Sequence, residues 1–217
     1  KFLIHEIPYL WPKNILNSKS LDIGFDPKIF TNKTLKMYFG DTCNLLPINK
    51  NLFKQNHEII NKNNLVYSID RRVAGESVKN KIERLIKIIK KNKIDNLYIS
   101  SSENVCWLLN IRGKDLPNSP VANFQAIITK TKNIFLLGNI KKLKNLKKKF
   151  SKEKIRFFEI DKFFEILNLL KGKNFCIDGK TCSVLNENLI HSKFSIKERI
   201  DPIYSLKSIK NKTEIKN

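Results

Sequence analysis

The hydrophobic pattern between residues 78 and 89 predicts an amphipathic helix. Its apolar side chains recur at the spacing of one helical face, at Val78, Ile82, Leu85, Ile86 and Ile89. Ser77 or Gly75 can cap the N-terminus of this helix. The remaining positions are mostly charged, and we expect them to form a solvated face: Lys79, Lys81, Glu83, Arg84, Lys87 and Lys90.

Short apolar runs after this helix predict strands at residues 96–100, 105–109, 124–129, 134–137, 156–160 and 174–178. A polar break at residues 130–133 predicts a hairpin between two of them. Helices are expected near 139–150, 161–170 and 182–190, followed by an extended segment at 200–203. The alternation of strands and helices predicts an α/β fold with a mixed β-sheet flanked by helices.

The first 53 residues predict only a partial α/β domain. A short strand is expected within 21–27, a helix from Asn32 with Thr31 as its N-cap, and extended pieces at 45–46 and 52–53. We therefore divide the chain into the remnant of a first domain (1–53), a polar linker (54–73), a middle α/β domain (74–204) and the truncated start of a further domain (205–217). The first residue is Lys1 rather than Met, and residues 206–215 begin a helix, so we expect a piece of a longer protein.

A loop after the predicted strand at 105–109 carries the candidate functional residues. It contains Arg112, Gly113, Asp115, Pro117 and Pro120. A buried strand that ends in a charged loop stiffened by glycine and proline commonly presents polar groups at a site. The alternative is an ordinary turn in which Arg112 and Asp115 form a local ion pair.

No sequence motif for catalysis is present. The glycine-rich phosphate loops, the HExxH zinc motif and the GxSxG nucleophile motif do not occur. The three histidines (His5, His57 and His191) are far apart, and the four cysteines (Cys43, Cys106, Cys176 and Cys182) form no CxxC pair. We therefore assign no catalytic residue and no metal site, and we expect free thiols in a reducing cytoplasm.

The net charge of +22 raises the question of nucleic-acid binding. Only six of the 42 basic residues are arginines, and the lysines are spread along the whole chain. Arginine is the preferred residue for paired contacts to phosphates and bases, so we do not expect nucleic acid as a partner. A membrane is not expected either, because no run of about eighteen apolar residues occurs.

The segment from Trp107 to Val121 (WLLNIRGKDLPNSPV) resembles the middle-domain signature of the Xaa-Pro aminopeptidases, which belong to the creatinase or "pita-bread" metallopeptidase family. Residues 24–27, 74–77, 201–202 and 206–215 are similar to flanking parts of the same family, in the same order. The sequence departs from the family in the linker. There the usual Trp and Arg-Pro after Asn51 and Leu52 are missing, and Ile59, Ile60 and Asn61 stand in their place.

The resemblance implies a parent enzyme that releases the N-terminal residue from peptides with proline in second position. Two divalent ions, usually manganese, would be held by two Asp, one His and two Glu of a catalytic domain that follows Asn217. This chain would supply none of these ligands. It would pack on its own catalytic domain, within a cytoplasmic homodimer, and the loop at 112–121 would face that domain or the second subunit. An interaction module of the same fold without catalytic activity is the alternative, and a basic nucleic-acid-binding domain is the less favoured one.

Overall fold

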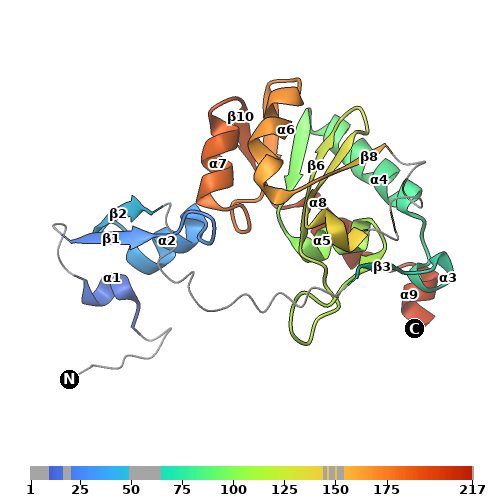
Figure 1. Cartoon of the computed structure of the whole chain (residues 1–217), viewed down its shortest axis with the longest axis horizontal. Coiled ribbons are helices and arrows are strands. Elements are labelled where there is room, and N and C mark those ends of the chain that lie inside the picture. Colours follow the sequence, from blue (N-terminus) through green and yellow to red (C-terminus); the bar gives the residue numbers. More distant parts are fainter. Residues whose placement is uncertain are drawn as a thin grey trace. The chain divides into compact units, whose positions relative to one another are not determined.

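The computed structural model describes residues 10–16, 21–48, 65–143, 146, 150 and 154–216 (Figure 1). The chain divides into two compact units. The first comprises Lys1–Ile59 and Gly179–Asn188, and the second comprises Ile60–Asp178 and Leu189–Asn217. The short segment from 179 to 188 thus belongs to the first unit, although it lies far later in the sequence.

The first unit contains a small parallel sheet, formed by β1 (Asp22–Phe25) and β2 (Asn44–Pro47). Helix α1 (Pro12–Ile15) precedes the sheet, and α2 (Asn32–Phe39) connects its two strands. The predicted N-cap is confirmed, because the side chain of Thr31 accepts a hydrogen bond from the Thr34 backbone N–H at 3.0 Å. Phe25 and Leu35 are buried together with Val184, the first residue of α7 (Val184–His191).

The second unit is built on a six-stranded mixed sheet, in the order β10-β9-β4-β6-β7-β8. Its strands are β4 (Asn96–Ile99), β6 (Phe124–Thr129), β7 (Ile134–Gly138), β8 (Ile155–Phe158), β9 (Asn174–Ile177) and β10 (Ser195–Glu198). Strand β6 pairs antiparallel with β4 and β7, while β9 and β10, like β7 and β8, pair in parallel. The predicted mixed α/β fold and the hairpin at 130–133 are confirmed.

Helices cover both faces of this sheet, and alternate residues of β4 show how. Leu97 and Ile99 belong to the core shared with α4 (Val78–Lys91), α5 (Ser102–Leu108) and α8 (Pro202–Ser208). Tyr98 points to the other face, where its ring lies 5.1 Å from that of Phe163 in α6 (Phe163–Leu169). Figure 1 shows α6 on the side of the sheet opposite α4. Burying each large apolar side chain contributes about 1.5–3 kcal/mol to this arrangement.

The prediction of a strand at 105–109 is wrong, because these residues belong to α5 and the turn that follows it. Val105, Leu108 and Leu109 are all buried. Their i, i+3 and i+4 spacing fits one helical face as well as their apolar character fits a buried strand. A short apolar run does not distinguish the two, and here the helix packs on β6.

The C-terminal part of the second unit also differs from the prediction. The sequence does not indicate β10, whose side chains are exposed or partly exposed at the edge of the sheet. Residues 202–203 were expected to be extended, but Pro202 begins α8, with the Asp201 carboxylate capping its N-terminus. The helical segment expected from 206 is divided between α8 and α9 (Lys212–Lys216).

Three predictions fall wholly or partly outside the described residues, and the extended piece expected at 52–53 lies outside entirely. The expected helix near 139–150 is described as a 3₁₀-helix at Ile140–Leu143, and residues 144–145 and 147–149 lie outside. Of the predicted linker at 54–73, residues 54–64 lie outside, and the rest contains β3 (Tyr67–Ser68) and the start of α3 (Arg71–Ala74). The domain boundaries inferred from the sequence stay predictions.

Candidate functional site

The loop that carries the predicted site residues is anchored at its start by a short strand. After α5, the chain turns at Asn110, which has a φ of +50°, into β5 (Ile111–Arg112). Strand β5 pairs antiparallel with β3, so that Tyr67 lies opposite Arg112. Residues 67–68, from before α4, therefore hold the entry of the loop.

Beyond β5 the loop folds back on itself. The Gly113 N–H donates to the Pro120 carbonyl at 3.3 Å, and the Asp115 N–H donates to the Val121 carbonyl at 3.0 Å. At the tip, Pro117 and Asn118 form the corner of a turn in which Asn118 has a φ of +57°. Proline followed by a residue with positive φ is typical of a type II turn. The base of the loop is thus rigid, while Pro117 and Asn118 are exposed.

Gly113 is required by a close approach of two chain segments. A Cβ atom at this position would lie 2.8 Å from the Cβ and 2.9 Å from the Cα of Ala122. Ala122 is fully buried, so neither segment can move away without disturbing the core.

Gly113→Ala is expected to lower the free energy of unfolding by roughly 2 kcal/mol, the usual cost of forcing an extra methyl group into a packed site. Urea denaturation followed by tryptophan fluorescence measures the change. Gly40→Ala in the first unit is a comparison variant, because a Cβ there would lie no closer than 3.7 Å to its neighbours. Its positive φ of 57° still adds backbone strain. Wild-type stability of Gly113→Ala would contradict the close approach.

The expected ion pair between Arg112 and Asp115 is replaced by other partners. The Asp115 carboxylate forms an ion pair with Lys142 and accepts a hydrogen bond from the Asn123 N–H at 2.8 Å. The Arg112 guanidinium donates to the carbonyls of Ile111 at 2.8 Å and Cys106 at 3.4 Å. Because Cys106 lies in the last turn of α5, Arg112 neutralises the C-terminal end of that helix. Both charged residues of the loop thus hold structure in place.

A buried lysine beside the loop was missed by the sequence analysis. Lys81 was expected on the solvated face of α4, but only 2% of it is exposed. Its Nζ atom donates to the Trp107 carbonyl at 2.9 Å and to Asn110 Oδ1 at 2.7 Å, and lies 4.0 Å from the centre of the Trp107 ring. The helical spacing could have indicated the burial of Lys81, because this residue stands three positions after Val78 and four before Leu85.

The environment of Lys81 affects its proton affinity. Desolvation by burial lowers the pKa of the Lys81 ammonium to about 8, against the opposing attraction of Glu214 and Glu76. Asn110, which accepts a hydrogen bond from Lys81, also donates to the Glu76 carbonyl at 2.8 Å. The lysine therefore ties α4 to the turn that starts the loop.

A second buried polar network joins α5 to α8. Asn104 donates from Nδ2 to Asp201 Oδ2 at 2.7 Å and accepts at Oδ1 from Lys207 Nζ, also at 2.7 Å. Lys207 in addition forms an ion pair with Glu103 at 2.8 Å. Burial raises the pKa of the Asp201 carboxyl above its ordinary value. These contacts fix the junction between the sheet and the C-terminal helices.

Neither network has the composition of a catalytic metal centre. In the part of the chain that the structure describes, no three His, Cys, Asp or Glu side chains are grouped to hold a metal ion. The four cysteines form no disulfide, and burial raises the pKa of the Cys106 and Cys176 thiols. No helix among the described residues is long and apolar enough to cross a membrane.

Comparisons with known proteins agree with this fold. Residues 60–214 match the family model described as the creatinase/prolidase N-terminal domain. Over 206 residues the chain is 28% identical to Xaa-Pro aminopeptidase 1 of Dictyostelium discoideum. This alignment covers 94% of this chain and 30% of that protein. It is also 32% identical over 146 residues to Protein pid-5 of Caenorhabditis elegans, covering 64% of this chain and 14% of that protein.

A solved structure has the same fold along almost the whole chain. The crystal structure of an X-prolyl aminopeptidase from Caenorhabditis elegans, described as a cytosolic enzyme with a di-nuclear active site, superposes with a TM-score of 0.77 at 23% identity. The match covers 95% of this chain and 35% of that protein, so the chain spans about a third of the length of such relatives. Because the family model covers residues 60–214, and Xaa-Pro aminopeptidases match over most of its length, this chain belongs to the creatinase/prolidase N-terminal domain family.

Proposed function

We propose that this chain is the non-catalytic N-terminal and middle part of a metal-dependent Xaa-Pro aminopeptidase. Such an enzyme releases the N-terminal residue from peptides that have proline in second position. The observation that carries the proposal is the match to Dictyostelium discoideum Xaa-Pro aminopeptidase 1 along 94% of this chain. The proposed enzyme acts in the cytoplasm, as its Caenorhabditis elegans relative is described to do.

The catalytic metals of the proposed enzyme lie outside this chain. We expect two divalent ions, with manganese as the metal, in a catalytic domain that this chain does not contain. The di-nuclear site of the Caenorhabditis elegans relative supports the number of ions. The described residues offer no ligand cluster that fits such a pair, so we assign no step of peptide hydrolysis to them.

The loop with Arg112, Gly113, Asp115, Pro117 and Pro120 is proposed to face the catalytic domain, or the second subunit of a homodimer, and to limit access of peptides to the cleft. Its base is held by backbone hydrogen bonds and by the Asp115–Lys142 ion pair. Its tip exposes an apolar side chain, since 49% of Leu116 is accessible. A rigid base and an exposed apolar tip suit a loop that contacts a neighbouring domain or a peptide.

The chain alone is expected to have no peptidase activity. Incubation with an Xaa-Pro tripeptide and added manganese should release no N-terminal residue, because no metal ligands are grouped among the described residues. The parent enzyme with its catalytic domain should release the residue under the same conditions, and a chelator should stop it. Amino-acid analysis detects the product. Metal-dependent release by the chain alone would overturn the placement of the active site.

In the parent enzyme, Leu116→Ser is expected to lower kcat/KM for Xaa-Pro peptides by roughly three- to tenfold through lost positioning of the peptide. The melting temperature of this chain alone should stay the same, because Leu116 is half exposed in it. Arg112→Ala is the comparison variant: it removes the bonds to Cys106 and Ile111 and should lower the melting temperature. Unchanged kcat/KM in both variants would show that the loop only braces the domain.

A further inference from the structure

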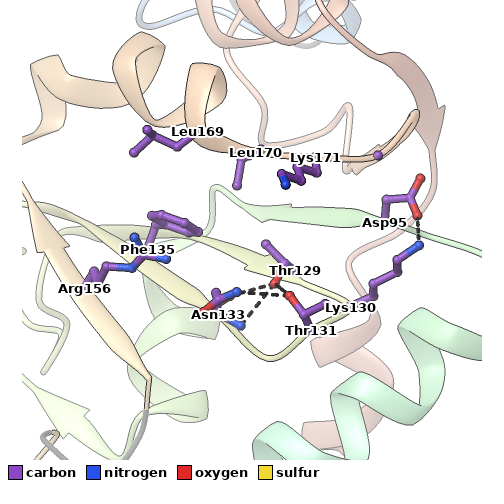
Figure 2. Close-up of a pocket in the computed structure, with 11 residues that line it drawn as sticks. Asp95, Thr129, Lys130, Thr131, Asn133, Phe135, Arg156, Leu169, Leu170 and Lys171 are labelled. Carbon is purple, nitrogen blue, oxygen red and sulfur yellow. Dashed lines mark hydrogen bonds and ion pairs between the residues drawn. The ribbon is translucent and has the colours of Figure 1, made fainter.

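A cavity of about 320 Å³ lies within the second unit, away from the loop at 112–121. It opens between the β6–β7 hairpin and the segment that follows α6. Figure 2 shows Leu169, Leu170 and Lys171 on one wall, facing Thr129, Thr131 and Asn133 on the other. Its volume is near the lower end of the range for small-molecule sites, which is about 300–1,000 Å³. The space therefore suits a ligand of about one ring and one polar group.

One side of the cavity is apolar and aromatic. The Phe135 ring lines it, with the Arg156 guanidinium 4.6 Å from the ring centre (Figure 2). Leu169 and Leu170 add aliphatic surface from above, and 59% of Leu169 is exposed. The Phe135 ring is only 2% exposed and forms the floor, so a planar ring placed here would replace water on the two leucines.

The opposite wall is polar and already ordered. The hydroxyl groups of Thr129 and Thr131 are hydrogen-bonded to each other at 2.8 Å. Asn133 donates from Nδ2 to the Thr131 hydroxyl at 3.0 Å and from its backbone N–H to the Thr129 hydroxyl at 3.1 Å. The hairpin turn is thus fixed before any ligand arrives, which lowers the entropic cost of binding.

The charge of the lining residues is positive. The one carboxylate of the lining is Asp95, which is paired with Lys130 at 2.6 Å. It also accepts hydrogen bonds from the backbone N–H groups of Lys173 at 2.9 Å and Asn174 at 3.0 Å. These bonds lower the pKa of Asp95 to about 2, so its charge is permanent and fully engaged. In the described part of the chain, no carboxylate pairs with the two other cations of the lining, Arg156 and Lys171.

We propose that this cavity binds a small organic anion: a carboxylate or phosphate group attached to a single flat apolar ring. The anionic group is neutralised by Lys171 and Arg156, and the ring packs on Leu169 and Leu170. Arg156 is held in place for this role, because its guanidinium lies 4.6 Å from the centre of the Phe135 ring. This site is independent of the proposed peptidase function, since none of its residues belongs to the loop at 112–121.

In the test, the 217-residue chain is titrated separately with phenyl phosphate, phenylacetate and the neutral benzyl alcohol, and isothermal titration calorimetry measures the binding. At least one of the anions should bind saturably at one site, and benzyl alcohol roughly tenfold or more weakly than that anion, because it lacks charge-assisted hydrogen bonds. The stronger of the two anions identifies phosphate or carboxylate as the preferred group. Binding should weaken as salt is added.

Variants locate the site. Lys171→Gln and Arg156→Gln should each lower the affinity for the preferred anion by roughly tenfold. Leu169→Glu should do the same by placing a negative charge at the rim, at a position exposed enough to accept it. Lys141→Gln is the matched control: Lys141 is also exposed but lies beyond the other end of β7. It should bind like the wild type.

Four results would overturn the proposal. The first is the absence of saturable binding for both anions, and the second is equal binding of benzyl alcohol. The third is an equal loss in Lys141→Gln and Lys171→Gln, which would show a general attraction of anions to a chain of net charge +22. Wild-type affinity in Lys171→Gln, Arg156→Gln and Leu169→Glu together would place the bound anion elsewhere.

Discussion

Asp201→Ala is expected to lower the free energy of unfolding by about 2–3 kcal/mol, through two separate losses. The first is the N-cap of α8, because the Asp201 carboxylate accepts the Ile203 N–H at 2.9 Å; such caps contribute about 1 kcal/mol. The second is the partner of Asn104 Nδ2, a fully buried donor that lies 2.7 Å from Asp201. A buried donor without a partner costs about 1–3 kcal/mol.

Asn104 cannot recover its bond by rotating its amide group. Its Oδ1 atom accepts from Lys207, so an exchange of O and N would place two donors together. The buried charge of Asp201 carries a cost of its own, which offsets part of the loss and keeps the estimate below the sum of the two maxima. For a chain of this size the melting temperature should fall by roughly 5–10 °C.

Asp161→Ala is the matched control, because Asp161 is exposed, and it should change stability by less than about 0.5 kcal/mol. Asp201→Asn separates the two losses: it keeps a capping oxygen but can present an amide nitrogen to Asn104. The free energy of unfolding of Asp201→Asn should lie between those of the wild type and Asp201→Ala. Equal stability of Asp201→Ala and Asp161→Ala in urea denaturation would show that the network contributes nothing.

The sequence predicted those elements whose local pattern has one physical solution. Helix α4 repeats its apolar residues over twelve positions, Val78 to Ile89, which only a helix can place on one face. Strands β6 and β7 are apolar runs separated by a short polar turn, and a hairpin is their simplest arrangement. The segment at 105–109 has no such unique solution, because it is too short to show a period.

The parts that could not be predicted depend on partners far away in the sequence. Asn104 and Asp201 are 97 residues apart, and Lys81 is 29 residues from Asn110. Strand β10 lies at the edge of the sheet and pairs only with β9, so its side chains stay partly exposed. It therefore has no continuous apolar run that the sequence could show. Asp115 stands close to Arg112 in the sequence, yet it pairs with Lys142 from a lysine-rich segment that gave no reason to choose one lysine over another. Tertiary packing determines each of these contacts.

The stability of the second unit is expected to rise with pH between about 8 and 10.5 through Lys81. In the folded chain, burial lowers the pKa of this lysine from 10.5 to about 8. Below pH 8 both the folded and the unfolded chain hold the proton. Between the two values only the unfolded chain holds it, so a higher pH favours the folded state. A difference of about 2.5 pH units corresponds to roughly 3 kcal/mol.

Lys81→Met isolates this contribution, because all other groups titrate equally in both proteins. The free energy of unfolding of the wild type minus that of the variant, from urea denaturation at several pH values, should be constant below pH 8 and rise toward pH 10.5. Around the ammonium, Glu214 and Glu76 stabilise the charged form, while Arg112 and Arg84 oppose it. Glu76→Gln should therefore move the start of the rise to lower pH. A difference that stays constant from pH 7 to 10.5 would mean that the buried lysine keeps its ordinary pKa. The hydrogen bonds to Trp107 and Asn110 would then fully compensate for the loss of water.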